Sequence, residues 1–366
     1  MNRFPTFTVC APGLEAITVG ELAKIGVTGN PTHGGVNASM TMAQLMTANL
    51  RLRTATRVLV RVARFPADGF VTLAEGLAKI DWHPWLLEDT QVDVTVSSSQ
   101  SKLYHTGAVQ ERVLDALGVG TVGPGQVVSV RIIRDEVTVS IDSSGEALHK
   151  RGYRQATAKA PIRETLAAAL ILASEWDRRR PLLDPFCGSG TIPIEAAMIA
   201  RRMAPGRNRP FAFQRWPQFD AAAWTRVVAG ADADVIDKMP VILGSDRDEG
   251  AITASRSNAV RAGVAPVFTH ATLSEIVALA PVGWLITNPP YGERVAGGDL
   301  RDLYDRWKSL MGEGAFAGWH LSLIAPHDAL TRRLGHLDSA LRTANGGIDV
   351  DVLRRPQAEA AAVPAV

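Results

Sequence analysis

The chain has 366 residues, of which 46% are hydrophobic and 21% charged, and its formal net charge is +2. This length suits two or three globular domains, and no run of eighteen apolar residues suggests a membrane span. The two cysteines are too few for a disulfide framework or a structural zinc site, and the first residues lack the layout of a secretion signal. We therefore expect a cytoplasmic protein that uses neither a metal ion nor a membrane.

Residues 1–150 have the pattern of small α+β modules. Apolar residues recur at helical spacing from Leu14 to Ile25, where Gly26 ends the segment, and Val58 to Val62 alternate as in a strand. Further along, alternation predicts strands at 92–96, 128–132 and 137–141, and a helical pattern covers 108–117. Because this half has no glycine-rich phosphate loop, we expect it to bind a partner and not to catalyse.

After Gly152 the pattern changes to alternating helices and apolar strands. A helix is expected over 162–176, strands over 181–183, 241–243 and 284–286, and a second helix over 251–262. This alternation is typical of a doubly wound α/β domain with a parallel sheet. The change of pattern places the domain boundary near residues 150–165.

Two stretches, 148–163 and 201–215, contain only basic residues among their charged positions. The second also carries Phe211 and Phe213, with Trp216 just beyond it. Basic residues interleaved with aromatic rings suit contacts to phosphates and stacking on bases. Two solvated loops would have the same composition, so both interpretations stay open.

A glycine-rich turn follows the strand at 181–183. It begins with Asp184 and continues through Gly188 and Gly190 into a helix near Ile192. The glycines allow a tight turn and a close approach to a ligand, and the helix N-terminus supplies free N–H groups. The turn lacks the lysine of a phosphate-binding P-loop and the full Gly-x-Gly-x-x-Gly of dinucleotide enzymes. The acidic residue suits a cationic ligand with an amino-acid head group, such as S-adenosylmethionine.

The next strand ends at Asp246. A carboxylate at this position can accept hydrogen bonds from both ribose hydroxyls of a nucleoside. The alternative is that Asp246 caps the helix that begins near Glu249.

The segment from Trp284 to Gly292 contains the most specific motif, Asn288-Pro289-Pro290-Tyr291. Prolines directly after an apolar strand cannot continue its ladder and hold the backbone rigid at the sheet edge. The Asn288 side chain and the Pro289 carbonyl offer two acceptors for the hydrogens of an exocyclic amino group, and Tyr291 offers a ring for a base taken out of its helix. Such a group is a poor nucleophile, so positioning supplies most of the catalysis. A purely structural Pro-Pro turn is the alternative.

These motifs resemble those of class I S-adenosylmethionine-dependent methyltransferases that act on nitrogen. The flanking segments resemble THUMP-domain RNA methyltransferases, specifically the bacterial 23S ribosomal RNA guanine-N2-methyltransferase family, over nearly the whole chain. The segments that carry this resemblance are Ser101–Thr106, Leu148–Arg154, Ala160–Leu166, Glu195–Met198, Ala204–Gly206, Phe211–Phe213, Trp216 and Asn345–Ile348.

The resemblance implies a ferredoxin-like segment over 1–62, a THUMP RNA-binding domain over 63–155 and a Rossmann-like catalytic domain over 156–366. It implies methylation of guanosine N2, with ribosomal RNA favoured over transfer RNA as the structured RNA partner. The catalytic set is Asn288, Pro289, Pro290 and Tyr291. The implied cofactor contacts are Thr165, Asp184, Phe186, Gly188, Gly190, Thr191, Asp246, Arg247, His270 and Asn288.

One departure from the family pattern lies at Phe268–Leu273, where an acidic residue near the adenine is usual and none occurs. His270, Thr269 or backbone groups would have to replace it. Other activities that share Asn-Pro-Pro-Tyr remain open: transfer RNA guanine-N2-methylation, N6-adenine methylation of DNA, and glutamine methylation of a protein. A non-catalytic RNA chaperone is disfavoured by the presence of Asp184, Asp246 and Asn288.

Overall fold

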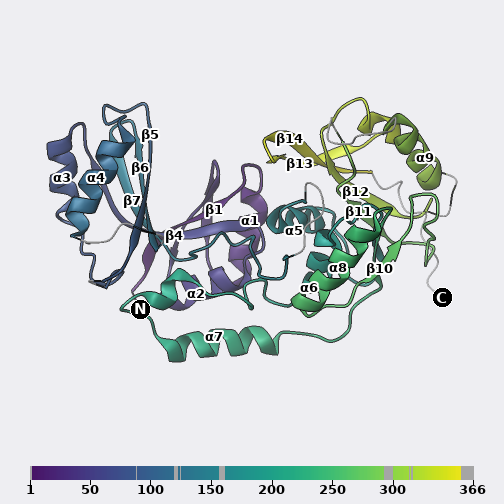
Figure 1. Ribbon diagram of the computed structural model, residues 1–366, viewed down its shortest axis with the longest axis horizontal. Helices are drawn as coiled ribbons and strands as arrows, with labels where there is room; N and C mark the ends of the chain where they lie inside the picture. Colours follow the sequence, from purple (N-terminus) through teal and green to yellow (C-terminus); the bar gives the residue numbers. More distant parts are fainter. Residues whose placement is uncertain are drawn as a thin grey trace. The chain divides into compact units, whose positions relative to one another are not determined.

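A computed structural model describes residues 2–87, 89–118, 123, 125–155, 161–291, 300–312, 314 and 316–355 (Figure 1). The chain divides into two compact units. The first comprises residues 1–10, 18–148 and 209–231, and the second comprises 11–17, 149–208 and 232–366. In the described ranges no helix is both long and apolar enough to cross a bilayer.

The first unit contains a seven-stranded sheet in the order β2-β3-β1-β4-β7-β6-β5. Neighbouring strands run antiparallel except β5 and β6, which are parallel. The strands are β1 (Phe4–Cys10), β2 (Gly29–Thr32), β3 (Gly35–Met40), β4 (Ala55–Pro66), β5 (Val92–Ser99), β6 (Gln126–Ile133) and β7 (Glu136–Asp142). The helices are α1 (Glu15–Lys24), α2 (Met42–Arg51), α3 (Phe70–Leu77) and α4 (Thr106–Leu117).

Strand β4 joins the two N-terminal segments expected from the sequence. Its first half pairs with β1 and its second half pairs with β7. The expected limit between residues 62 and 63 therefore falls inside one continuous strand. A single sheet thus runs through the ferredoxin-like segment and the segment that follows it.

Burial alternates along β5, β6 and the first four residues of β7, so this part of the sheet has one buried and one largely exposed face. Valine and isoleucine side chains such as Val94, Val130 and Val139 are buried. Figure 1 shows α3 and α4 on one side of these strands. The opposite face carries polar residues such as Ser97 and Arg131, as expected for an antiparallel sheet that faces water on one side.

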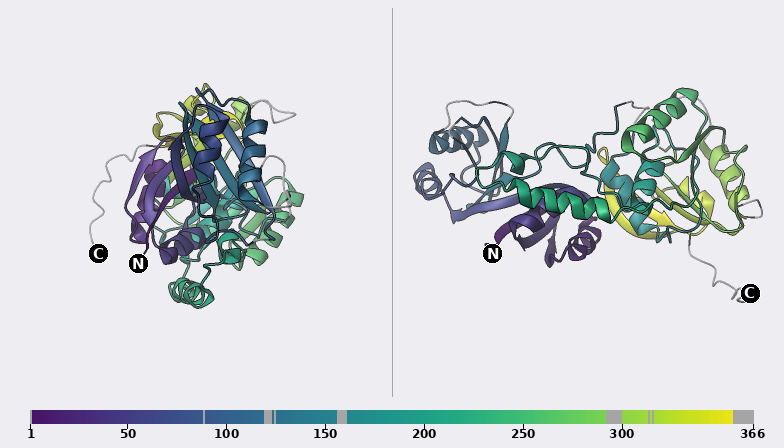
Figure 2. Two further views of the ribbon diagram at one scale, coloured as in Figure 1. Left: turned by 90° about the vertical axis from the view of Figure 1, so that its left-hand side faces the viewer. Right: turned by 90° about the horizontal axis from the view of Figure 1, so that it is seen from below.

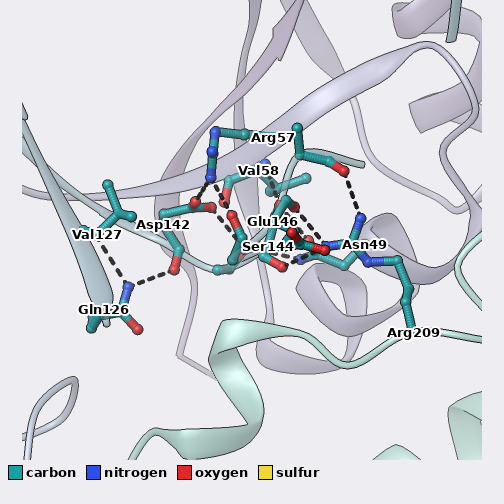
Figure 3. A network of polar contacts seen from close by, with 12 residues as sticks. Asn49, Arg57, Val58, Gln126, Val127, Asp142, Ser144, Glu146 and Arg209 are labelled. Carbon is teal, nitrogen blue, oxygen red and sulfur yellow. Dashed lines mark hydrogen bonds and ion pairs between the residues drawn. The ribbon is translucent and has the colours of Figure 1, made fainter. Parts of the chain in front are cut away.

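A buried polar network joins β4, β7 and α2 (Figure 3). Asp142 is fully buried, pairs with Arg57 and accepts the Ser144 N–H at 2.8 Å. The Ser144 hydroxyl donates to Asn49 at 2.6 Å and accepts the Val58 N–H at 2.8 Å. Burial raises the pKa of the Asp142 carboxyl, and the Arg57 guanidinium opposes that rise. The pairing compensates for the cost of placing a carboxylate in the core.

The segment 209–231 returns to the first unit, although the sequence suggested that everything after residue 156 belongs to the catalytic domain. It contains a short 3₁₀ helix at Ala212–Arg215 and most of α7 (Ala221–Ala233), the long helix in the right-hand view of Figure 2. Arg209 donates to the carbonyls of Ser144, Glu146 and Ala147 at 2.6 to 3.2 Å (Figure 3). The Trp216 indole donates to Gln126 at 2.9 Å.

The second unit contains a seven-stranded sheet in the order β10-β9-β8-β11-β12-β14-β13. Its strands are β8 (Leu182–Asp184), β9 (Ile242–Asp246), β10 (Val267–His270), β11 (Trp284–Thr287), β12 (His320–Ala325), β13 (Asp338–Asn345) and β14 (Ile348–Arg354). Its helices are α5 (Glu164–Ala173), α6 (Thr191–Ala200), α8 (Glu249–Ala262) and α9 (Leu300–Gly312), with a 3₁₀ turn at Thr331–Leu334.

Strands β8 to β12 are parallel, and β14 runs antiparallel to β12. Consecutive residues of β8, β11 and β12 are buried, which means that both faces of this sheet are covered. The order of strands reverses between β8 and β11, where a doubly wound fold binds its ligand. The Rossmann-like α/β fold expected from the sequence is confirmed.

Candidate active site

Three functional motifs meet at one edge of the second sheet. Strand β8 lies between β9 and β11, with Leu183 beside Leu243 on one side and Leu285 on the other. Because these strands are parallel, Asp184 and Asp246, the last residues of β8 and β9, lie at the same edge as Asn288, which directly follows β11. The sequence prediction that the motifs form one site agrees with this placement, while the role of each residue stays a prediction.

Asp184 lies beneath the glycine turn. Its carboxyl group is 1% exposed and accepts the Thr287 hydroxyl at 2.5 Å and the Phe186 N–H at 3.1 Å. Burial raises the pKa of this carboxyl to about 7, although both hydrogen bonds oppose the rise. Asp184 therefore ties the end of β8 to the end of β11 and holds the first residues of the turn.

The glycine turn approaches its neighbours too closely for side chains. Gly190 has φ +85°, and a Cβ there would lie 2.8 Å from the Ser255 Cβ and 2.9 Å from the Phe268 ring. Thr191, buried, begins α6 directly after this glycine. Among the described residues no side chain caps the helix at Gly190.

Asp246 is held by backbone N–H groups. One carboxylate oxygen accepts the Gly188 N–H at 2.9 Å, and the other accepts the Asp248 N–H at 3.0 Å. The cap of α8 is Asp248, whose side chain accepts the N–H groups of Gly250 and Ala251. The alternative that Asp246 caps this helix is therefore wrong. Its carboxylate is half-buried and anchored next to the glycine turn.

Asn288 is half-buried, and its side-chain oxygen is inaccessible to solvent. Within the described part of the chain this oxygen accepts no hydrogen bond. A buried acceptor without a donor is costly in a folded protein and calls for an explanation, of which a functional role is one. Pro289 is buried and Pro290 half-buried beside it, and Gly292 lies outside the described residues.

Helix α9 and strand β13 support the Asn-Pro-Pro-Tyr loop. The Tyr304 hydroxyl donates to the Pro290 carbonyl at 3.2 Å, and the Asn345 side chain donates to the Tyr291 hydroxyl at 2.8 Å. The Tyr291 ring is only 7% exposed, so its stacking on a base stays a prediction. Tyr304 is fully buried, and burial raises the pKa of its hydroxyl, which keeps it a donor.

Trp307 extends this support to the glycine turn, because its indole meets the Phe186 ring edge-on with ring centroids 5.6 Å apart. The sequence analysis missed Tyr304 and Trp307. Their place among apolar residues at helical spacing from Leu300 to Met311 could have predicted a packed helix, but not its contacts.

The remaining predicted cofactor contacts are the side chains of His270, Arg247 and Thr165. His270 ends β10 beside Asp246 in the strand register, is exposed, and has its ring nitrogen 3.0 Å from the carbonyl of the exposed Arg247. Thr165 is buried in the first turn of α5. Contacts of these three side chains with a cofactor stay predictions.

The two basic stretches have largely structural roles. Arg151 and Arg154 lie close to the buried carboxylates of Glu195 and Glu164, at 3.6 and 2.5 Å. In the second stretch, Arg201 donates to the carbonyls of Ile236 and Gly263, Arg207 pairs with Asp232, and Arg209 is bonded as described above.

The aromatic residues of the second stretch are part of a core. Phe211, Phe213 and Trp216 are at most 3% exposed and pack inside the first unit, so they cannot stack on RNA bases. The interpretation that these rings stack on RNA bases is therefore wrong, while phosphate contacts of the basic residues stay untested. Composition alone cannot distinguish a ring that faces solvent from one that fills a core. Lys159 of the first stretch lies outside the described residues.

Two family models match the chain. The model described as "RMKL-like, methyltransferase domain" matches residues 151–350, and the one described as "RlmL ferredoxin-like domain" matches residues 6–59. Among curated proteins, the chain is 33% identical to "Putative RNA methyltransferase slr0064" of Synechocystis, over 96% of each chain.

Solved structures extend this similarity to three dimensions. The structure of SMU.472, described as "a putative methyltransferase complexed with SAH", matches with a TM-score of 0.88 and 30% identity, covering 97% of this chain and 98% of the other. A structure described as "a predicted N6-adenine-specific DNA methylase" from Listeria monocytogenes matches with a TM-score of 0.88 and 33% identity, covering 97% and 96%. The similarity therefore includes both units.

Proposed function

Because this chain belongs to the RMKL-like methyltransferase family, we propose that it methylates the exocyclic N2 of a guanosine in structured RNA, with 23S ribosomal RNA as the first candidate. The cofactor is S-adenosylmethionine, whose demethylated product is present in the SMU.472 structure. The coarser activity, methyl transfer to RNA, rests on the family. The base and the atom rest on the residues discussed below.

The carboxyl edge of the second sheet suits this cofactor. The glycine turn packs so closely on Ser255 and Phe268 that Gly190 has no space for a side chain, and the backbone of the turn leads directly into α6. The Asp246 carboxylate, fixed by the Gly188 N–H, suits the ribose hydroxyls. We assign the remaining cofactor contacts to Phe186, Gly188, Thr191 and, at the adenine end, His270. When bound, the cofactor supplies an electrophilic methyl group.

The unmatched oxygen of Asn288 is the observation that carries the proposal. A base amino group has two hydrogens, and Asn288 Oδ1 with the Pro289 carbonyl would accept both. This arrangement directs the nitrogen lone pair toward the methyl group. As the nitrogen–carbon bond forms and the sulfur–carbon bond breaks, the amino group becomes more acidic, and it then loses one proton to water.

Cys187 does not suit an alternative chemistry at carbon. Methylation of pyrimidine carbons by a covalent route needs a thiolate nucleophile. Cys187 is 6% exposed, and burial together with the nearby carboxyl groups of Asp184 and Asp246 raises the pKa of its thiol. A raised thiol pKa leaves little thiolate at neutral pH, which favours direct attack by nitrogen.

We assign RNA binding to the first unit, with residues 63–155 as a THUMP-type module. This assignment is supported by the resemblance of Ser101–Thr106 and by the name of the Synechocystis relative. Adenine N6 in DNA is the second candidate, because the Listeria structure carries that description and an adenine amino group would fit the same pair of acceptors.

The test is to identify the methylated nucleoside. RNA, DNA and protein from a strain that lacks the gene are incubated with the enzyme and isotope-labelled S-adenosylmethionine, and the ribosomal RNA, transfer RNA, DNA and protein fractions are digested and analysed by mass spectrometry. We expect labelled N2-methylguanosine in the large ribosomal RNA, and a loss of about 100-fold or more in its rate of formation with Asn288→Ala. Label in N6-methyladenine of DNA, or in protein glutamine, would overturn the proposal.

A further inference from the structure

The exposed face of strands β4 to β7 carries two rows of polar side chains. Strand register defines them. The first row joins Arg61, Ser140, Ser129 and Thr95, and the second joins Arg64, Thr138, Arg131 and Ser97. We call these eight residues the open face. All are exposed or half-buried except Ser140, which is 5% exposed.

A β-bulge places the two arginines of β4 on the same face. Arg61 and Arg64 are three positions apart, so a regular strand would direct them to opposite sides. The register with β7 shifts between Arg61 and Ala63, which leaves Val62 as the extra residue. In the strand register Arg61 lies opposite Ser140, and Arg64 lies opposite Thr138. Ser140 and Thr138 are two residues apart on β7, so both arginines lie on the same face of the sheet. Bulges of this kind commonly redirect a side chain for function.

The charge of the open face is locally positive. Arg64 pairs with Glu136 at 2.9 Å, and the Arg61 guanidinium lies over the Phe7 ring, 4.8 Å from its centroid. Among the described residues, no ion pair involves Arg61 or Arg131. Burial and the positive charges of Arg64 and Arg131 together lower the pKa of Arg61. An anion bound between these side chains would relieve their repulsion.

Carboxylates of the same face lie at its margins. Asp142 is paired with Arg57, Asp93 lies at the far end of β5 beside Val127 in the register, and Glu136, two residues from Thr138 on β7, is paired with Arg64. The two rows thus place three arginines among five hydroxyl side chains, with no carboxylate between them. Strands spaced about 4.8 Å apart make each row roughly 14 Å wide, enough for several contacts along a backbone.

The side-chain chemistry selects a type of nucleic acid. Proteins that hold single strands present aromatic rings on which bases stack. The open face has arginines for phosphates and hydroxyls for sugar contacts, but no aromatic residue in either row. Double-stranded RNA is recognised largely through phosphates and 2′-hydroxyl groups.

We propose that the open face binds the sugar-phosphate backbone of double-stranded RNA, with Arg61 and Arg131 as its principal phosphate contacts. This rests on the proposed function only in taking RNA as the substrate. The face would hold a helical segment of the substrate by its shape and leave recognition of the target base to the Asn288 site. We therefore assign contact with RNA to the open face and not to the stretch at 201–216, whose aromatic residues are buried.

The test uses the full chain with the double substitution Arg61→Gln/Arg131→Gln. The matched control is Arg112→Gln on α4, an exposed arginine on the helix side that pairs with Asp115 at 3.7 Å. Binding to a fluorescent RNA hairpin is measured by anisotropy at several salt concentrations. We expect the double variant to bind about tenfold more weakly, with a salt dependence reduced by about two ion equivalents. The control should bind as the unsubstituted protein does.

Folding and cofactor binding separate a loss of contacts from a loss of structure. The double variant should unfold at the same temperature as the unsubstituted protein and bind S-adenosylhomocysteine with the same affinity. Unchanged hairpin affinity and salt dependence would overturn the proposal. Equal competition by single-stranded RNA would also overturn it, as would equal competition by duplex DNA.

This binding assay is independent of methyl transfer. If N2-methylguanosine fails to form but hairpin binding still depends on Arg61 and Arg131, the proposed reaction is wrong and the open face stands. If the reaction is confirmed but the double variant binds normally, the open face is wrong and RNA is held elsewhere.

Discussion

The two sheets of this protein present their functional groups in different ways. In the second unit β8, β11 and β12 are buried along their length, so chemistry is confined to the residues that follow the strand ends. In the first unit, β5 to β7 are buried on one face only, and the other face carries polar side chains. A parallel sheet covered on both sides offers an edge, which suits one small reacting group. A half-covered sheet offers a surface, which suits an extended partner.

The comparison predicts that substitutions at the strand ends affect the rate and not RNA affinity. Asn288→Ala should have the largest effect, lowering methyl transfer by about 100-fold or more, because it removes a preorganised acceptor for the amino group. Single-turnover kinetics and hairpin anisotropy measure the two quantities separately. Equal losses of methyl-transfer rate and RNA affinity would contradict the assignment of catalysis to the strand ends of the second unit and of RNA binding to the sheet face of the first.

Gly190→Ala tests whether the edge tolerates any side chain. A Cβ at φ +85° would lie 2.8 Å from Ser255 and 2.9 Å from Phe268, so we expect a loss of about 2 kcal/mol in unfolding free energy and weaker cofactor binding. Gly107→Ala, at a position in α4 with no heavy atom within 4 Å, is the matched control and should change stability by less than about 1 kcal/mol. Urea titrations measure the unfolding free energy of both variants. Equal losses in the two variants would contradict the close packing at the glycine turn.

Tyr304→Phe tests how the edge is supported from α9. The substitution removes the donor to the Pro290 carbonyl but keeps the buried ring, so we expect kcat to fall about tenfold while the KM for RNA stays the same. A purely structural role would lower the melting temperature and leave kcat unaffected. An unchanged kcat would therefore show that Tyr304 does not position the Asn-Pro-Pro-Tyr loop for catalysis.

Asp184→Asn should change the stability of the protein to an extent that depends on pH. The carboxyl pKa is raised to about 7 in the folded chain, so the folded state binds more protons than the unfolded state between pH values of about 4 and 7. Its contribution to stability is full below this range and is lost as the pH rises through it. The asparagine variant should be more stable than the unsubstituted protein at pH 8, and the difference should shrink toward pH 4. Parallel stability curves from ligand-free urea titrations would contradict the raised pKa.

The strand-end motifs could be predicted because each is local. Asp184, Asp246 and Asn288 follow short apolar strands, and turn chemistry is encoded within a few residues. The contacts of Tyr304 and Asn345 could not be predicted, since they join segments that are distant in sequence. The loop at 288–291 gives no indication of either partner.

The first unit shows the same limit on a larger scale. Its strands at 92–141 were predicted from alternation, and the structure contains them as β5, β6 and β7. The bulge at Val62 has no marker in the sequence, because neither glycine nor proline accompanies it. The packing of Phe211, Phe213 and Trp216 in this core could not be predicted for another reason. In the sequence, the segment lies between two motifs of the second unit, the glycine turn and Asp246.

The discontinuous first unit affects how the protein is made. Its sheet is complete in sequence at Asp142, but Trp216 and its neighbours, which fill part of the same core, follow only after the glycine turn and α6. A nascent chain emerging at 5–20 residues per second would wait roughly 4 to 17 s between residues 148 and 231. During that interval the N-terminal sheet has an unfilled apolar surface while the second unit is still partly inside the ribosome. Synthesis therefore links the maturation of the two units, and a fragment that ends near residue 150 would retain an exposed, aggregation-prone core.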